Sequence, residues 1–123
     1  ISAGELLDKI TILEIKMDKI KNEDDKKEVL REYKSLKKTQ KENIKFNEEI
    51  KKLYDELKQT NSKLWEIEDK LRILEKEKKL DNDFIELARG VYFNNDDRSK
   101  IKLKINKLLK SNIREIKQYV EYN

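Results

Sequence analysis

An unbroken heptad repeat in the middle of the chain constrains the fold more than any other feature. Between residues 50 and 74, apolar residues recur at alternating spacings of three and four, with Thr60 as the one polar member. This period places the side chains in one stripe along a helix and is typical of a left-handed coiled-coil seam. The repeat therefore predicts a long helix packed against a partner helix. Its members are Ile50, Leu53, Leu57, Thr60, Leu64, Ile67, Leu71 and Leu74.

The composition extends this prediction to the whole chain. There is no Pro, and the only two Gly are Gly4 and Gly90, so few residues favour turns. Hydrophobic residues make up 36% of the chain and charged residues 46%, which is typical of thin bundles whose helices mostly face water. We predict an all-α fold, an elongated antiparallel helical bundle or coiled coil of about four helices. At 123 residues the chain forms a single helical domain.

Capping signals divide the chain into helices. Ser2 is a candidate N-cap, and Asn47 precedes two acidic residues that suit a first helical turn. The apolar phase nearly survives across residue 46, so a single helix from about residue 25 to 79 is an alternative. The predicted helices span about residues 4–22, 24–45, 48–79 and 83–110, and residues 111–123 form a loose C-terminal extension in which Ile116, Tyr119 and Val120 dock.

The fourth helix carries polar residues within its apolar seam. Asn94 and Arg98 occupy positions of the repeat where apolar residues are expected. Either the helix is continuous with a polar layer, or it breaks at residues 94–97, and the preserved phase favours continuity. Folding the chain back at residue 81 brings Glu68 opposite Arg98, so we expect this pair to meet near the middle of the bundle.

A central polar cluster is the main candidate for function. Its residues on the third helix share one face, as do most of those on the fourth, and an aromatic ring beside Arg, Asn and carboxylate groups suits a sugar or a small anion. The structural interpretation is a buried polar layer that fixes register, and a third interpretation is surface ion pairs. The cluster consists of Asn61, Trp65, Glu68, Asp69, Arg89, Tyr92, Asn95 and Arg98.

A second candidate is the basic segment over residues 98–110, which contains no acidic residue. Its interleaved apolar residues make it amphipathic, so it suits nucleic acid or an anionic membrane surface. A solvated helix face is the alternative. The chain has 30 basic and 26 acidic residues, a balance that argues against a dedicated nucleic-acid partner.

The chain contains neither Cys nor His. This excludes disulfides, thiolate or imidazole metal sites, and nucleophiles paired with His. Carboxylates such as Glu14, Glu68 and Asp69 are available, but bundle di-iron sites also use His, so we predict no metal and no cofactor. We expect no transmembrane segment, since no apolar run approaches about 20 residues, and we expect a cytoplasmic location.

Three segments resemble a family of small uncharacterised bacterial all-helical proteins. They are GELLDKITILEIK at residues 4–16, LWEIED at 64–69 and FIELARGVY at 84–92. The family has no assigned activity. Its members are sometimes encoded near or fused to glycosyltransferase-like and tetratricopeptide-repeat proteins. The resemblance therefore implies, at most, an association with glycan or glycosyltransferase machinery.

These observations favour a non-enzymatic helical scaffold or adaptor that forms a homo-oligomer, a dimer, or binds a partner protein. The first alternative is a protein or enzyme that binds a sugar or an anionic metabolite at the central polar cluster. The second alternative is nucleic-acid binding through the basic segment.

Overall fold

The computed structural model describes residues 1–122 and the side chains of residues 1–109. Its described backbone consists of helices joined by short connections, and no strand occurs in it. The helices are α1 (Ala3–Lys19), α2 (Glu23–Asn43), α3 (Glu48–Lys76) and α4 (Asn82–Tyr122). The prediction of an all-α helical bundle is confirmed.

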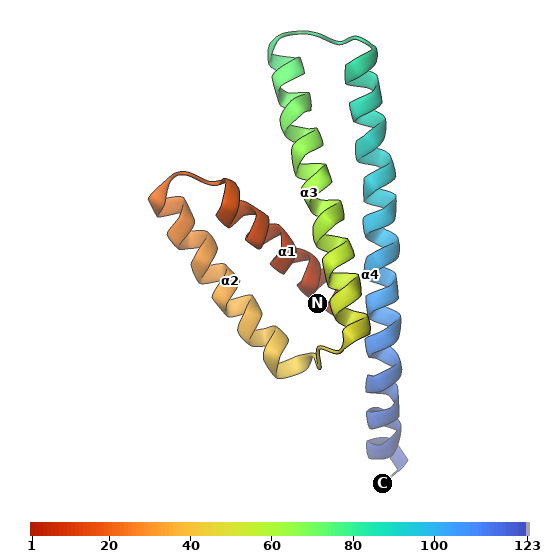
Figure 1. Cartoon of the computed structure of the whole chain (residues 1–123). Helices are drawn as coiled ribbons and strands as arrows, with labels where there is room; N and C mark the ends of the chain where they lie inside the picture. Colours follow the sequence, from red (N-terminus) through yellow and green to blue (C-terminus); the bar gives the residue numbers. More distant parts are fainter. Residues whose placement is uncertain (123) are drawn as a thin grey trace.

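The four helices form two antiparallel hairpins of unequal length (Figure 1). α3 and α4 make the long hairpin, while α1 and α2 make a shorter one that packs beside its lower half. α1 contacts each of the other helices, whereas α2 packs mainly on α1. The upper half of the α3–α4 hairpin therefore extends beyond α1 and α2.

Side-chain caps fix where the helices begin. The Ser2 hydroxyl accepts a hydrogen bond from the Glu5 N–H at 3.2 Å, as predicted. The Asn47 side chain accepts one from the Ile50 N–H at 2.8 Å. α2 ends at Asn43 and α3 begins at Glu48, so the alternative of one helix from residue 25 to 79 is wrong.

α4 is continuous through residues 94–97, as its preserved apolar phase indicated. The Asn94 side chain donates to the Gly90 carbonyl oxygen at 2.8 Å, so this polar seam residue is satisfied within its own helix. α4 continues to Tyr122, whereas we expected it to end near residue 110. Neither Pro nor Gly follows Gly90, so nothing in the sequence stops the helix. The predicted docking of residues 116–120 lies outside the described side chains.

The hydrophobic core lies where α1 meets the lower halves of α3 and α4. Within residues 65–98, which are all described, no side chain is buried, although the heptad repeat runs on through both helices. The core cluster consists of Leu6, Leu7, Ile10, Ile44, Ile50, Tyr54, Leu57, Ile101, Ile105 and Leu109.

Candidate functional site

A buried carboxylate, Asp8, is the centre of the most ordered polar group in the molecule. It lies on α1 among leucine and isoleucine side chains, and only 1% of its surface is exposed. Arg98 on α4 forms a bidentate ion pair with the Asp8 carboxylate. The Arg98 Nε donates to Asp8 Oδ1 at 2.8 Å, and Arg98 Nη2 pairs with Oδ2. This fork geometry gives the strongest type of charge-assisted hydrogen bond.

Asn61 on α3 and Thr11 on α1 complete this group. The Asn61 Nδ2 donates to Asp8 Oδ1 at 2.9 Å and to the Thr11 hydroxyl oxygen at 2.8 Å. The Thr11 hydroxyl in turn donates to the Asp8 carbonyl oxygen at 2.7 Å. We call Asp8, Thr11, Asn61 and Arg98 the junction network, because it joins α1 to α3 and α4 at one point.

The junction network shifts the ionisation of its charged members. Burial raises the pKa of the Asp8 carboxyl, but hydrogen bonds from Arg98 and Asn61, with the charges of Arg98 and Lys102, outweigh it and hold that pKa below its ordinary value. The hydrogen bond to Asp8 raises the pKa of Arg98 against the effect of burial. Both groups are therefore held in their charged forms, which suits an ion pair rather than a proton donor or acceptor.

α1 also meets α4 at an unusually close backbone contact. A Cβ added at Gly4 would lie 2.7 Å from the Lys102 carbonyl oxygen, so only glycine fits there. The Gly4 N–H donates to Asn106 Oδ1 at 2.7 Å, and Lys102 pairs with Glu5. These contacts fix the start of α1 on α4 and so place Asp8 opposite Arg98.

The predicted central polar cluster is therefore divided in the structure. Asn61 and Arg98 come together, but through Asp8, and the expected pair of Glu68 with Arg98 is wrong. Glu68 is exposed and acts on Arg98 only as a nearby charge that raises its pKa. Trp65 is half-buried one turn beyond Asn61.

The remaining members of the cluster lie on the surface. Asp69, Arg89, Tyr92 and Asn95 are all exposed. Asp69 pairs with Arg72 at 3.9 Å, and Arg89 pairs with Glu86 at 3.6 Å, each within one helix. Such pairs contribute little to stability, as the surface interpretation expected.

Asp8 is the site residue that sequence reasoning missed, although a signal for it exists. Gly4, Asp8 and Thr11 are spaced by four and three on the most apolar helix, so they form a small polar row beside the leucine seam. A polar row at the spacing of a buried stripe indicates a buried polar contact. The partner on another helix is not indicated by that spacing.

The basic segment at residues 98–110 is also divided. Ile101, Ile105 and Leu109 point into the core, whereas Leu103 and Leu108 are 58% and 36% exposed. Arg98 and Lys102 are paired with carboxylates of α1. Lysines at positions 100, 104 and 107 remain exposed.

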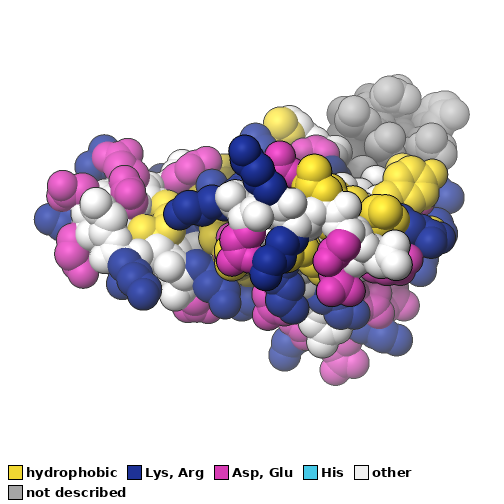
Figure 2. Space-filling model, turned by 90° about the horizontal axis from the view of Figure 1, so that it is seen from above, with side chains coloured by type: hydrophobic (Ala, Val, Ile, Leu, Met, Phe, Trp, Pro, Cys, Tyr) yellow, Lys and Arg dark blue, Asp and Glu magenta, His cyan; other side chains and the backbone are white. Residues whose placement is uncertain are grey.

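An exposed apolar patch lies on the outer side of α4. Ile85, Tyr92 and Phe93 are 52%, 66% and 53% exposed. The Phe93 ring lies 5.8 Å from the Tyr92 ring and 5.7 Å from the Arg89 guanidinium carbon. Figure 2, viewed from the end formed by the α3–α4 turn, shows uncovered hydrophobic side chains on the right, where α4 lies. We call Ile85, Arg89, Tyr92 and Phe93 the aromatic patch.

Comparison with known proteins places the chain in a family. Residues 1–122 match a family of unknown function across almost the whole chain. The chain belongs to DUF6165. No curated protein and no solved structure matches it. In the part of this DUF6165 chain that the structure describes, no helix has the length and apolar character to cross a membrane.

The prediction of an uncharacterised family is confirmed, and DUF6165 membership brings no activity with it. Among the described residues, no three acidic side chains converge as a metal site would require. Neither Asp8 nor Arg98 lines the surface grooves between α3 and α4.

Proposed function

We propose that this DUF6165 chain is a non-enzymatic helical scaffold or adaptor that presents its α3–α4 hairpin to partner proteins. One observation carries the proposal. The heptad repeat continues through residues 65–98, yet no side chain there is buried. The stability of a pair of helices packed only on each other is marginal. An apolar stripe of this length is normally covered by further helices.

The junction network supports this proposal because it suits a structural role. Each polar group that Asn61 and Arg98 direct at α1 meets Asp8 or Thr11. A ligand site needs donors aimed into open space, whereas these donors are used within the fold. The network is suited to hold α1 rigidly on the hairpin and so to present the upper hairpin in a fixed direction.

The aromatic patch has the composition of a protein-binding surface. Tyr, Phe and Arg are enriched in interfaces, and Tyr and Arg are frequent among residues that dominate binding energy. Ile85, Arg89 and Tyr92 follow one another at spacings of four and three, so they form one stripe. The seam residues Leu87 and Val91 lie on another side of α4, which leaves this stripe free for a partner.

The compartment and the physiological partner are proposals from the sequence. The absence of Cys suits a reducing compartment, which supports a cytoplasmic location. The association with glycan or glycosyltransferase machinery follows only from the family resemblance.

Site-specific photocrosslinking in cells tests the adaptor function. A photoreactive amino acid in place of Tyr92 samples the aromatic patch, and the same group in place of Arg31 on α2 is the matched exposed control. We expect position 92 to give a discrete adduct with another protein, and position 31 to give none. Phe93→Ser should reduce the adduct at least fivefold without changing the helical circular dichroism. No adduct at position 92, or the same adducts at both positions, would overturn the proposal.

A further inference from the structure

One whole face of the α3–α4 hairpin is left open by the described residues. Three shallow grooves of about 430, 290 and 520 Å³ follow one another along it, each between α3 and α4. From the lower end upward, their floors contain the pairs Leu53 and Leu108, Thr60 and Ile101, and Leu74 and Leu87.

This open face lies on the side of the hairpin away from α1. On α3, Lys63 lines a groove, while Asn61, two residues earlier, contacts α1. On α4, Lys104 lines a groove, while Lys102 pairs with Glu5 of α1. Residues two apart point to nearly opposite sides of a helix, so α1 and the grooves occupy opposite faces. We use "open face" for the face with the three grooves.

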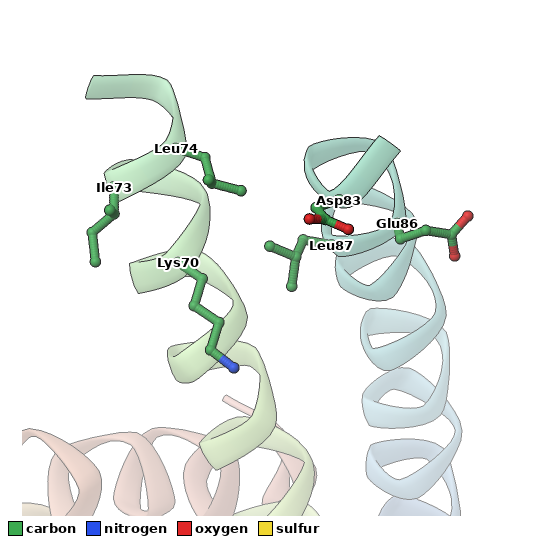
Figure 3. Close-up of a pocket in the computed structure, with 6 residues that line it drawn as sticks. All are labelled: Lys70, Ile73, Leu74, Asp83, Glu86 and Leu87. Atoms are coloured by element: carbon green, nitrogen blue, oxygen red, sulfur yellow. The ribbon is translucent and has the colours of Figure 1, made fainter. Parts of the chain in front are cut away.

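The upper groove shows what the open face offers a partner (Figure 3). Leu74 and Leu87 point toward each other from α3 and α4, and both are only half-buried. Lys70 reaches from α3 toward the gap between the helices. Asp83 and Glu86 line the same groove from α4. The groove thus has an apolar floor and a basic side chain on its α3 wall. On the α4 wall Asp83 points toward the groove, whereas Glu86 points away from it and pairs with Arg89.

The lower groove has the opposite arrangement of charge. Its α4 wall carries Lys104 and Lys107. Its α3 wall carries Glu49 and Glu56, with Lys52 between them. The sign of charge on each helix therefore reverses along the open face, while the floor remains apolar at both ends.

A two-fold rotation about an axis parallel to α3 and α4 makes this pattern self-complementary. It places α3 of each copy opposite α4 of the other at the same height, because the axis runs along the helices. Glu56 of each copy then faces Lys104 of the other at the same height. The apolar floors meet between these charges, as in the core of an antiparallel four-helix bundle.

The size of the open face suits a stable dimer. The 29 residues of α3 span about 43 Å at about 1.5 Å per residue. Two adjacent helices are about 20 Å across, so the open face covers about 860 Å². Stable protein interfaces bury about 800 Å² on each partner.

We propose that a second copy of this chain docks on the open face, so that two α3–α4 hairpins form a four-helix bundle. This inference rests on the proposed scaffold function and names one partner and the face that it uses. α1 and α2 lie on the outer side of each hairpin in this arrangement, and they remain clear of the contact.

Charge reversal with mixing tests this inference by analytical ultracentrifugation of the full chain. We expect the unmodified chain to form dimers. Lys104→Glu and Glu56→Lys should each weaken self-association at least tenfold, because each places like charges opposite one another in both halves of the interface. An equimolar mixture of the two variants should restore dimers to within threefold of the original affinity. In the mixed pair, every reversed charge meets its complement.

Lys34→Glu on α2 is the matched control, because it makes the same charge change at an exposed position off the open face. It should leave the dimer unchanged. Three results would each overturn the inference: a monomeric unmodified chain at millimolar concentration, single variants that dimerise normally, or a mixture that stays monomeric. The crosslink at position 92 uses a different side of α4. Its persistence in Lys104→Glu would leave the adaptor proposal standing when the dimer fails.

Discussion

Replacing Arg98 with leucine is the sharpest test of the junction network. Asp8 is 1% exposed and receives two of its three side-chain hydrogen bonds from Arg98. Leucine removes both and leaves a buried carboxylate held by Asn61 alone. Breaking a buried ion pair by removing one partner costs about 3–5 kcal/mol. Because the Arg98 side chain is itself 29% exposed, water reaches the pair and we expect about 3 kcal/mol.

Urea unfolding followed by circular dichroism measures this loss. With a denaturant dependence of about 2 kcal/mol/M, a loss of about 3 kcal/mol lowers the midpoint by about 1.5 M. Adding Asp8→Leu to Arg98→Leu should recover a large part of the loss, because no charge is then left buried. Such recovery in a double-mutant cycle is the signature of a direct pair.

The dependence on pH follows from the direction of the Asp8 pKa. That pKa is lowered on folding, so the pair stabilises the fold above the unfolded value of about 4, and this stabilisation is lost as the pH falls through the folded value. In Arg98→Leu, burial acts with less opposition and raises the Asp8 pKa. As the pH falls, the Asp8 carboxylate of the variant becomes protonated, so the variant no longer buries an unpaired charge. The difference in stability between the two proteins should therefore shrink from pH 7 to pH 3.

A neutral or stabilising effect of Arg98→Leu would refute this reasoning. So would a stability difference that does not change between pH 7 and pH 3. Either result would mean that Asp8 does not depend on Arg98 in the folded chain, and the guanidinium would be free for a ligand.

Three further substitutions follow from single contacts, each measured by urea unfolding. Gly4→Ala should destabilise by about 1–3 kcal/mol, since its Cβ would meet the Lys102 carbonyl at 2.7 Å, whereas Gly90→Ala meets only a movable Ile67 methyl at 3.2 Å and should be neutral or stabilising. Equal effects at the two glycines would contradict the close contact. Tyr54→Phe should be neutral or stabilise by about 1 kcal/mol, because the buried hydroxyl has no partner among the described residues; a loss above 1 kcal/mol would reveal one. Asn61→Leu should cost about 1–3 kcal/mol, and an unchanged midpoint would show that its bonds to α1 are dispensable.

The helices and their order were predictable because they depend on local patterns. The heptad spacing from Ile50 to Leu74 selects a helix, and the amide of Asn47 caps it whatever packs nearby. The continuity of α4 was predictable for the same reason. Asn94 bonds within its own helix, so a polar residue at a seam position does not break the turn.

The junction network was only half predictable, since it depends on where α1 lies. Folding α3 against α4 placed Asn61 and Arg98 at the centre of the bundle, and both are there. Their shared partner Asp8 stands 90 residues from Arg98 and 53 from Asn61, on a helix whose placement no spacing rule gives. Glu68 lies on the hairpin itself, so folding α3 against α4 predicts it as the partner of Arg98. The close contact of α1 with α4 at Gly4 places Asp8 beside Arg98, so Asp8 rather than Glu68 is the partner of Arg98.

The central claim is that the upper α3–α4 hairpin is a docking element that needs a partner. Hydrogen–deuterium exchange of the chain over a range of concentrations tests it most directly, since local protection reports local opening. We predict that amides of residues 65–98 exchange much faster than those of residues 50–64 in dilute solution. Their protection should then increase as the concentration rises and the open face is covered. Equal protection of the two segments at the lowest concentration, with no change on concentrating, would contradict the claim.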